Sequence, residues 1–162
     1  MQVQVGYDMT LSPACEVPEA VEVPAGYAVK VLSQADAGAL EKLCATEFPG
    51  WQGMSGSIGA GPNTGVAGVF DVATGELAAF AGFDEYIFFS TGTAVKYRRK
   101  GLGSVVFWTA VKRLLVAMPE TPIVIGCANL GFYARAFGCY IRGTVWRMQK
   151  DLTADQAISK GK

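Results

Sequence analysis

The segment Val-Lys-Tyr-Arg-Arg-Lys-Gly-Leu-Gly-Ser at residues 95–104 decides how this chain folds. The β-branched and aromatic residues of 86–95 predict a strand, and the apolar run of 105–118 predicts a long helix. A strand, a basic glycine turn and a helix favour a phosphate site. The reason is that the first N–H groups of a helix have no partner within it and lie at the positive end of its dipole. Gly101 and Gly103 let a ligand approach the backbone closely.

The spacing of glycines in this segment does not match two other known phosphate-binding loops. The chain has no Gly-x-x-x-x-Gly-Lys-Ser/Thr loop, and Val106 stands where a Gly-x-Gly-x-x-Gly dinucleotide loop needs its third glycine. Arg98, Arg99 and Lys100 supply the positive charges that a diphosphate would bind. A basic surface turn that contains two glycines is the structural alternative.

A second segment, about 30 residues further on, makes the interpretation more specific. Residues 122–126 (Pro-Ile-Val-Ile-Gly) predict a short buried strand. Residues 130–139 (Leu-Gly-Phe-Tyr-Ala-Arg-Ala-Phe-Gly-Cys) then predict a short helix that ends at a glycine. Together, the pattern Arg98-x-x-Gly101-x-Gly103 and this Phe-Tyr helix resemble the GNAT superfamily of acyl-CoA N-acyltransferases.

Two further features resemble a less common branch of that superfamily. Tyr133 precedes Gly138 by five positions, as in a Phe-Tyr-x-x-x-x-Gly helix, and a Phe-Pro-Gly-Trp segment stands at residues 48–51. The specific residues of the resemblance lie within 95–138. Its layout, with strands and helices in the superfamily's order, extends over residues 27–152.

The resemblance implies the fold and the division of the chain. The fold class is α/β (α+β mixed), the acyl-CoA N-acyltransferase fold, with a central mixed, mostly antiparallel sheet of about six to seven strands flanked by about four helices. This sheet would splay in the middle. Residues 1–26 would form an extended N-terminal arm, residues 27–152 the N-acetyltransferase domain and residues 153–162 a solvated tail.

The resemblance also implies that acetyl-CoA is the acyl donor and that no metal takes part. The pantetheine arm would pair with the strand before the turn, and the pyrophosphate would lie on the turn itself. The residues implied in cofactor binding are Ala94, Val95, Arg98, Arg99, Lys100, Gly101, Leu102, Gly103, Ser104 and Asn129.

By the same resemblance, Tyr133 is the proton donor to the departing CoA thiolate, and an ordinary buried tyrosine is the structural alternative. The acceptor amine must lose a proton before it attacks, because a free alkyl amine has a pKa near 10. Glu85, at a predicted turn between two strands, is the candidate base. Asp84 and a water chain stay open as alternatives, and both carboxylates could instead belong to a solvated turn.

The implied activity is acetyl transfer to the primary amine of a small molecule by direct attack on the thioester. Two alternatives stay open: a phage- or toxin-type transferase that modifies a nucleobase or aminoacyl-tRNA, and a non-catalytic acyl-CoA-binding domain. The formal net charge is zero, and the dense basic run at 98–100 is already assigned to CoA. This charge balance argues against a nucleic-acid acceptor.

The cysteines and the chain start indicate a compartment. The chain has no histidine and no Cys-x-x-Cys spacing, so a zinc site is not indicated. The N-terminus lacks a basic start followed by an apolar segment, and the longest apolar run is too short to span a bilayer. We expect a cytoplasmic protein that does not enter a membrane, and a homodimer stays open. Its thiols would be small, buried and reduced: Cys15, Cys44, Cys127 and Cys139.

Overall fold

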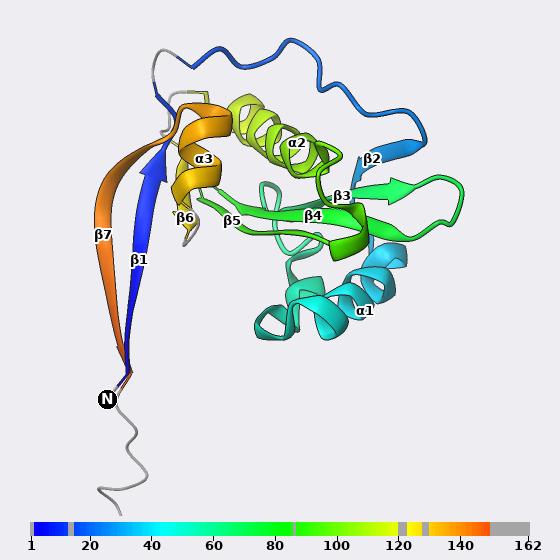
Figure 1. Cartoon of the computed structure of the whole chain (residues 1–162), viewed down its shortest axis with the longest axis horizontal. Helices are drawn as coiled ribbons and strands as arrows, with labels where there is room; N and C mark the ends of the chain where they lie inside the picture. The colour runs from blue at the N-terminus through cyan, green and yellow to red at the C-terminus, as the bar shows by residue number, and fades with distance from the viewer. Residues whose placement is uncertain (1, 13–14, 86, 120–122, 128–129, 150–162) are drawn as a thin grey trace, which may run out of the picture.

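The basic glycine turn joins strand β5 (Ile87–Thr93) to helix α2 (Leu102–Ala117), the arrangement that the sequence predicts. The structure, a computed structural model, describes residues 2–12, 15–85, 87–119, 123–127 and 130–149. These residues form a seven-stranded sheet with helices on both faces (Figure 1), and the mixed α/β class is confirmed.

The described part of the chain contains three α-helices and four short 3-10 segments where the sequence predicts about four helices. The other strands are β1 (Gln2–Thr10), β2 (Tyr27–Val31), β3 (Gly65–Asp71), β4 (Leu77–Asp84), β6 (Val124–Cys127) and β7 (Tyr140–Gln149). The other α-helices are α1 (Ala37–Glu47) and α3 (Leu130–Phe137). The 3-10 segments are η1 (Gln34–Asp36), η2 (Pro49–Trp51), η3 (Met54–Ser57) and η4 (Val95–Tyr97).

The order of strands in the sheet is β2-β3-β4-β5-β6-β1-β7. All neighbouring strands pair antiparallel except β5 and β6, which are parallel. This parallel pair is short, because its backbone partners are limited to Ile87 with Val124 and Phe88 with Ile125. Beyond Phe88 the two strands diverge, so the remainder of β5 has no strand partner on this side among the described residues. The sheet is therefore splayed in the middle, as the resemblance implies.

The N-terminal segment is arranged differently from the extended arm predicted for residues 1–26. Residues 2–10 form β1, which lies inside the sheet between β6 and β7 and pairs with both. Because Tyr7 pairs with Cys127 and Thr144, this position depends on contacts very distant in sequence. Residues 15–26 do run in an extended path, across helix α2 (Figure 1).

The C-terminal part of the sheet is the single strand β7, which contains one irregularity. In β7, Ile141 pairs with Met9 and Gly143 pairs with Asp8, so Arg142 is the extra residue of a β-bulge. A bulge bends a strand without ending it. Strand β7 therefore bends at Arg142 and continues past it to Gln149.

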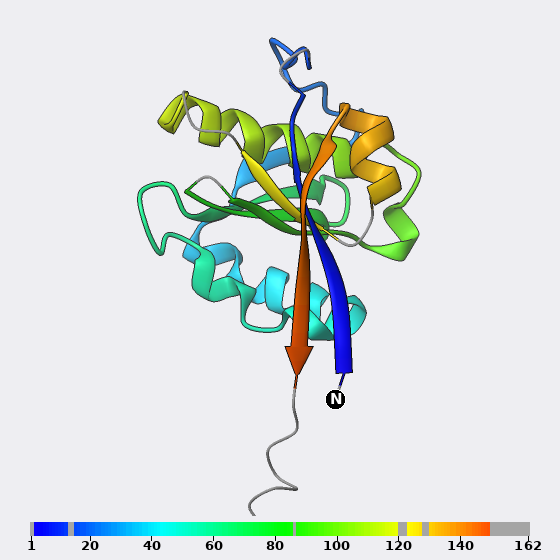
Figure 2. The same ribbon diagram turned by 90° about the vertical axis from the view of Figure 1, so that its left-hand side faces the viewer.

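Helices α2 and α1 cover opposite faces of the sheet (Figure 2). Strand β4 lies between them and is buried along nearly its whole length. Its small residues Ala78, Ala79 and Ala81 let both helices approach closely, and Phe80 and Phe83 fill the space between the layers. The core is thus centred on β4, next to the strand that carries the turn.

An aromatic cluster joins α3 to α2. The rings of Phe107 and Phe137 stack with centroids 3.7 Å apart at an angle of 16°, and the Tyr133 ring lies 5.9 Å from Phe107. All three side chains are buried. A helix of eight residues is not stable alone in water, so this packing holds α3 in place.

Phe137→Ala should therefore lower the free energy of unfolding by about 3–5 kcal/mol, the usual cost of removing a buried phenylalanine. Urea unfolding followed by circular dichroism measures it. Val116→Ala, at a site on α2 that is 79% exposed, is the control and should change stability by less than about 0.5 kcal/mol. A loss below about 1 kcal/mol for Phe137→Ala would contradict the packing of α3 on α2.

Candidate functional site

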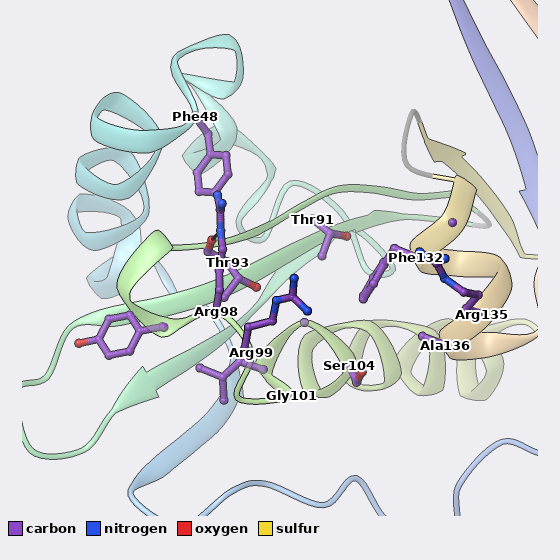
Figure 3. A pocket seen from close by; sticks show the side chains of 14 residues that line it. Phe48, Thr91, Thr93, Arg98, Arg99, Gly101, Ser104, Phe132, Arg135 and Ala136 are labelled. Atoms are coloured by element: carbon purple, nitrogen blue, oxygen red, sulfur yellow. Dashed lines mark hydrogen bonds between the residues drawn. The ribbon is translucent and has the colours of Figure 1, made fainter.

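A cleft of about 790 Å³ opens where β5 ends, α2 begins and α3 passes alongside (Figure 3). It lies on the side of β5 that β6 leaves free. Its lining comes from four parts of the chain: Phe48 after α1; Thr91 and Thr93 of β5; Tyr97, Arg98, Arg99 and residues 101–104 of the turn and helix start; and Gly131, Phe132, Arg135 and Ala136 of α3.

The backbone of β5 offers hydrogen-bonding groups to this cleft. The N–H of Ala94 donates to the carbonyl of Ala78 at 2.9 Å, which continues the ladder between β4 and β5. Hydrogen-bonded and non-hydrogen-bonded pairs alternate in an antiparallel ladder. The N–H and C=O groups of Thr93 and Thr91, which are opposite Ala79 and Ala81, therefore point away from β4. An extended ligand with amide groups can pair with this edge as an added strand does.

A bulge and a tyrosine define the end of the cleft that is farther from the glycine turn. Ser90 has a φ of 48° and lies where the register between β4 and β5 shifts, so a β-bulge precedes Thr91. The Tyr133 hydroxyl donates to Thr91 Oγ1 at 3.2 Å. The tyrosine side chain is buried, yet its hydroxyl reaches a residue that lines the cleft. A phenol in this place can supply a hydrogen bond or a proton to a ligand.

The start of α2 forms the other end of the cleft. Gly101 caps the helix with a φ of 78°, a left-handed conformation that glycine adopts without strain. The N–H groups of Leu102 and Gly103 follow at the first positions of the helix, where no helical carbonyl can accept them. A Cβ on Gly103 would stand 3.4 Å from Phe132 and 3.6 Å from Thr93 Oγ1. The helix start therefore faces the gap between β5 and α3.

Three arginines give the cleft its charge. Arg98 Nε donates to the carbonyl of Thr93 at 3.1 Å, and Arg99 lies beside it at the mouth of the cleft (Figure 3). Arg135 comes from α3 and packs on Gly131, where a Cβ would stand 3.0 Å from its guanidinium. The described lining contains no carboxylate. This combination of guanidinium groups and helix N–H groups fits a diphosphate.

The lining residues that were not predicted as site residues from the sequence include Arg135 and Phe48. Gly131 and Arg135 are four positions apart on α3, which places them on one helix face and is a signal that could have identified Arg135. Phe48 belongs to the Phe-Pro-Gly-Trp segment, and Trp51 stacks on it with ring centroids 5.3 Å apart. Trp51 thus supports the wall that Phe48 forms.

Some of the predicted cofactor contacts have other partners. Lys100 Nζ donates to the Tyr27 hydroxyl at 2.8 Å, and this hydrogen bond raises the pKa of Lys100. The N–H of Val95 donates to Glu47 Oε2 at 2.7 Å, while Ala94 is bonded to β4. None of these three residues lines the cleft. Asn129 lies outside the described residues.

The predicted base, Glu85, does not meet the cleft. It is exposed in the turn between β4 and β5, with a φ of 44°, at the opposite end of β5 from the glycine turn. Its neighbour Asp84 accepts a hydrogen bond from Thr64 Oγ1 at 2.5 Å and does not line the cleft either. The structure therefore brings together Tyr133, Arg98, Arg99 and residues 101–104, and leaves both carboxylates apart.

Two searches of the described residues bear on other kinds of site. No group of three or more histidine, cysteine, aspartate or glutamate residues in this part of the chain could hold a metal ion. The described helices also include none that is long and apolar enough to cross a membrane.

Comparisons with known proteins show a likeness in fold and none in sequence family. No family model and no curated protein matches the sequence. Among solved structures, a GCN5-related N-acetyltransferase from Sphaerobacter thermophilus is 16% identical, with a TM-score of 0.63 over 93% of this chain and 54% of its own. A GCN5-related N-acetyltransferase from Kribbella flavida is 19% identical, with a TM-score of 0.61 over 94% of this chain and 62% of its own. The fold is therefore that of the GNAT acetyltransferases.

A tandem GNAT protein from the clavulanic acid biosynthesis pathway is another neighbour, 19% identical with a TM-score of 0.61 over 93% of this chain. The chain covers between 50% and 63% of the length of the first solved structures that it resembles. The likeness therefore describes one part of each of those longer chains.

Arg135→Ala should weaken binding of inorganic pyrophosphate about tenfold, because a charge-assisted hydrogen bond is lost. Isothermal calorimetry at two salt concentrations measures this, and the effect should shrink at high salt. Arg113→Ala, at an exposed site on α2 outside the cleft, is the charge-matched control. Equal affinities of the two variants would show that Arg135 does not take part in anion binding.

Proposed function

We propose that this protein is an acetyl-CoA-dependent N-acetyltransferase that transfers an acetyl group to the primary amine of a small molecule by direct attack on the thioester. The observation that carries the proposal is one cleft that combines a free strand edge with a cationic helix start, and whose lining residue Thr91 accepts a hydrogen bond from the Tyr133 hydroxyl. The fold, which is shared with known N-acetyltransferases, supports it.

The groups in the cleft fit the parts of CoA in order. The N–H groups of Leu102 and Gly103, with Arg99 and Arg135, would hold the pyrophosphate. The edge of β5 at Thr91 and Thr93 would pair with the pantetheine amides. Arg98 now donates to the Thr93 carbonyl, and a phosphate would compete for this guanidinium and release the carbonyl for pantetheine.

This placement would put the thioester near Thr91 and Tyr133. The amine nitrogen attacks the carbonyl carbon, the carbon–sulfur bond breaks, and the Tyr133 hydroxyl gives its proton to the departing sulfur. The amine loses a proton to water, and water restores the phenol. The N–H of Thr91, on the free edge beside the bulge, would stabilise the developing oxyanion.

Water is the proposed acceptor of the amine's proton. The described lining has no carboxylate, and the chain has no histidine. Glu85 is separated from Thr91 by the first half of β5, roughly 15–20 Å at the rise of a strand. Holding the amine and the thioester together would then supply most of the rate. The acceptor would enter beside Phe48, whose ring offers an apolar contact.

Gly103→Asp should reduce the affinity for acetyl-CoA about 100-fold or more, because its carboxylate would stand against the pyrophosphate. Gly103→Asn has nearly the same shape without the charge and should lose less than about tenfold. Both substitutions should leave the protein folded, since a Cβ at this site makes only ordinary contacts. Calorimetry with acetyl-CoA distinguishes them, and unchanged affinity in Gly103→Asp would exclude the helix start as the pyrophosphate site.

Tyr133→Phe should leave acetyl-CoA affinity within about twofold and reduce turnover at saturating substrates by about 10² to 10⁴, the range of general acid catalysis. A panel of amines scored by release of free thiol provides the assay. Glu85→Gln is the comparison and should keep full turnover. Normal turnover in Tyr133→Phe would make this tyrosine structural, and a large loss in Glu85→Gln would restore Glu85 as the base.

A further inference from the structure

A second cavity, of about 370 Å³, lies between the extended N-terminal segment and helix α2. We call it the arm pocket. The extended segment contributes Pro18, Ala20, Val21, Glu22 and Pro24 to its lining, and α2 contributes Ser104, Val105 and Trp108 after the capping Gly101. We infer that the arm pocket binds the adenine base of the acyl-CoA donor, an inference that rests on the proposed function.

The arm pocket adjoins the cleft at the place where phosphate would bind. Gly101 and Ser104 line both cavities, so the start of α2 separates them. In CoA, the pyrophosphate joins the pantetheine arm to an adenosine that carries a further phosphate on its ribose 3′-oxygen. With the pyrophosphate at the helix start and the pantetheine along β5, the adenosine leaves the helix start on another side. The arm pocket is the neighbouring cavity that shares these residues.

The charges of the two linings differ, and each lining would suit a different part of CoA. Among the described residues, the cleft lining has three arginines and no carboxylate, whereas the arm pocket lining has no lysine or arginine and one carboxylate, Glu22. That carboxylate would keep the phosphates of CoA, the ribose 3′-phosphate included, outside the arm pocket, while a neutral base could enter it. Adenine also carries an exocyclic amino group that can donate a hydrogen bond to Glu22.

The composition and volume of the arm pocket suit a flat ring. Pro18, Pro24, Val21, Val105 and Trp108 make its walls largely apolar. An indole next to a base supplies stacking energy that does not depend on which base is bound. The volume is within the range of small-molecule pockets, and a purine is small enough to enter it.

The extended segment is held in place by α2 itself. Lys112 Nζ donates to the carbonyl of Pro18 at 3.1 Å and to the carbonyl of Glu19. At the other end, the carbonyl of Pro24 accepts the N–H of Tyr27 at 3.1 Å, where β2 begins. The wall of the arm pocket is thus attached on both sides of Ala20, and a base can bind without first ordering this segment.

The test compares two donors on the same protein. Acetyl-CoA carries the adenosine with its 3′- and 5′-phosphates, and acetyl-4′-phosphopantetheine lacks these but keeps the thioester, the pantetheine and one phosphate. Ala20→Phe fills the arm pocket from an exposed position. Ala25→Phe adds the same ring at an exposed site of the same segment outside the arm pocket and is the matched control. Calorimetry gives both affinities for each variant, and circular dichroism confirms that each is folded.

We expect Ala20→Phe to weaken acetyl-CoA binding about tenfold, the loss expected when a base is deprived of its stacking surface, with acetyl-4′-phosphopantetheine affinity changed less than about twofold. Ala25→Phe should change neither. If the unchanged protein binds acetyl-CoA but Ala20→Phe binds it equally well, the arm pocket inference is wrong and the proposed function stands. If the unchanged protein binds neither donor, the proposed function fails and the inference fails with it.

Discussion

The short parallel pairing of β5 and β6 is the constraint on which the rest of the site depends. Two strands that stayed paired along their whole length would satisfy each other's backbone groups and leave no edge for a ligand. Here the pairing stops after Phe88, so the N–H and C=O groups of Thr91 and Thr93 have no strand partner on this side among the described residues, and the Thr93 carbonyl accepts from Arg98 instead. The cleft, its lining residues and the proposed pairing with pantetheine all follow from this divergence.

Packing elsewhere holds the two strands apart. The stacked rings of Phe107 and Phe137 fix α3 against α2, and the hydrogen bond from Tyr133 to Thr91 then ties α3 to β5 across the gap. Gly92 makes room on the strand, because a Cβ there would stand 2.7 Å from Phe80 and 2.8 Å from Phe48. Phe48 can therefore pack against β5 and line the cleft because position 92 is a glycine.

The distribution of charge matters more here than its total. The formal net charge is zero, yet Arg98, Arg99 and Arg135 gather in the cleft from two separate segments. The adjacent arm pocket has only the carboxylate of Glu22 among its charged lining residues. A balanced sum thus conceals two cavities of opposite character, and opposite local potentials can direct the two ends of a single ligand.

The strand, glycine turn and helix at β5 and α2, and the short Tyr133 helix, could be predicted from the sequence, because periodicity, helix-start signals and glycine positions are local. The sequence also located Arg98, Arg99 and residues 101–104, since their contribution to an anion site depends on neighbours a few positions away. The place of β1 between β6 and β7, the distance of Glu85 from the cleft and the approach of Arg135 and Phe48 were decided by the tertiary structure. Each depends on contacts between segments far apart in the chain, and a local pattern carries no information about which distant surface will meet it.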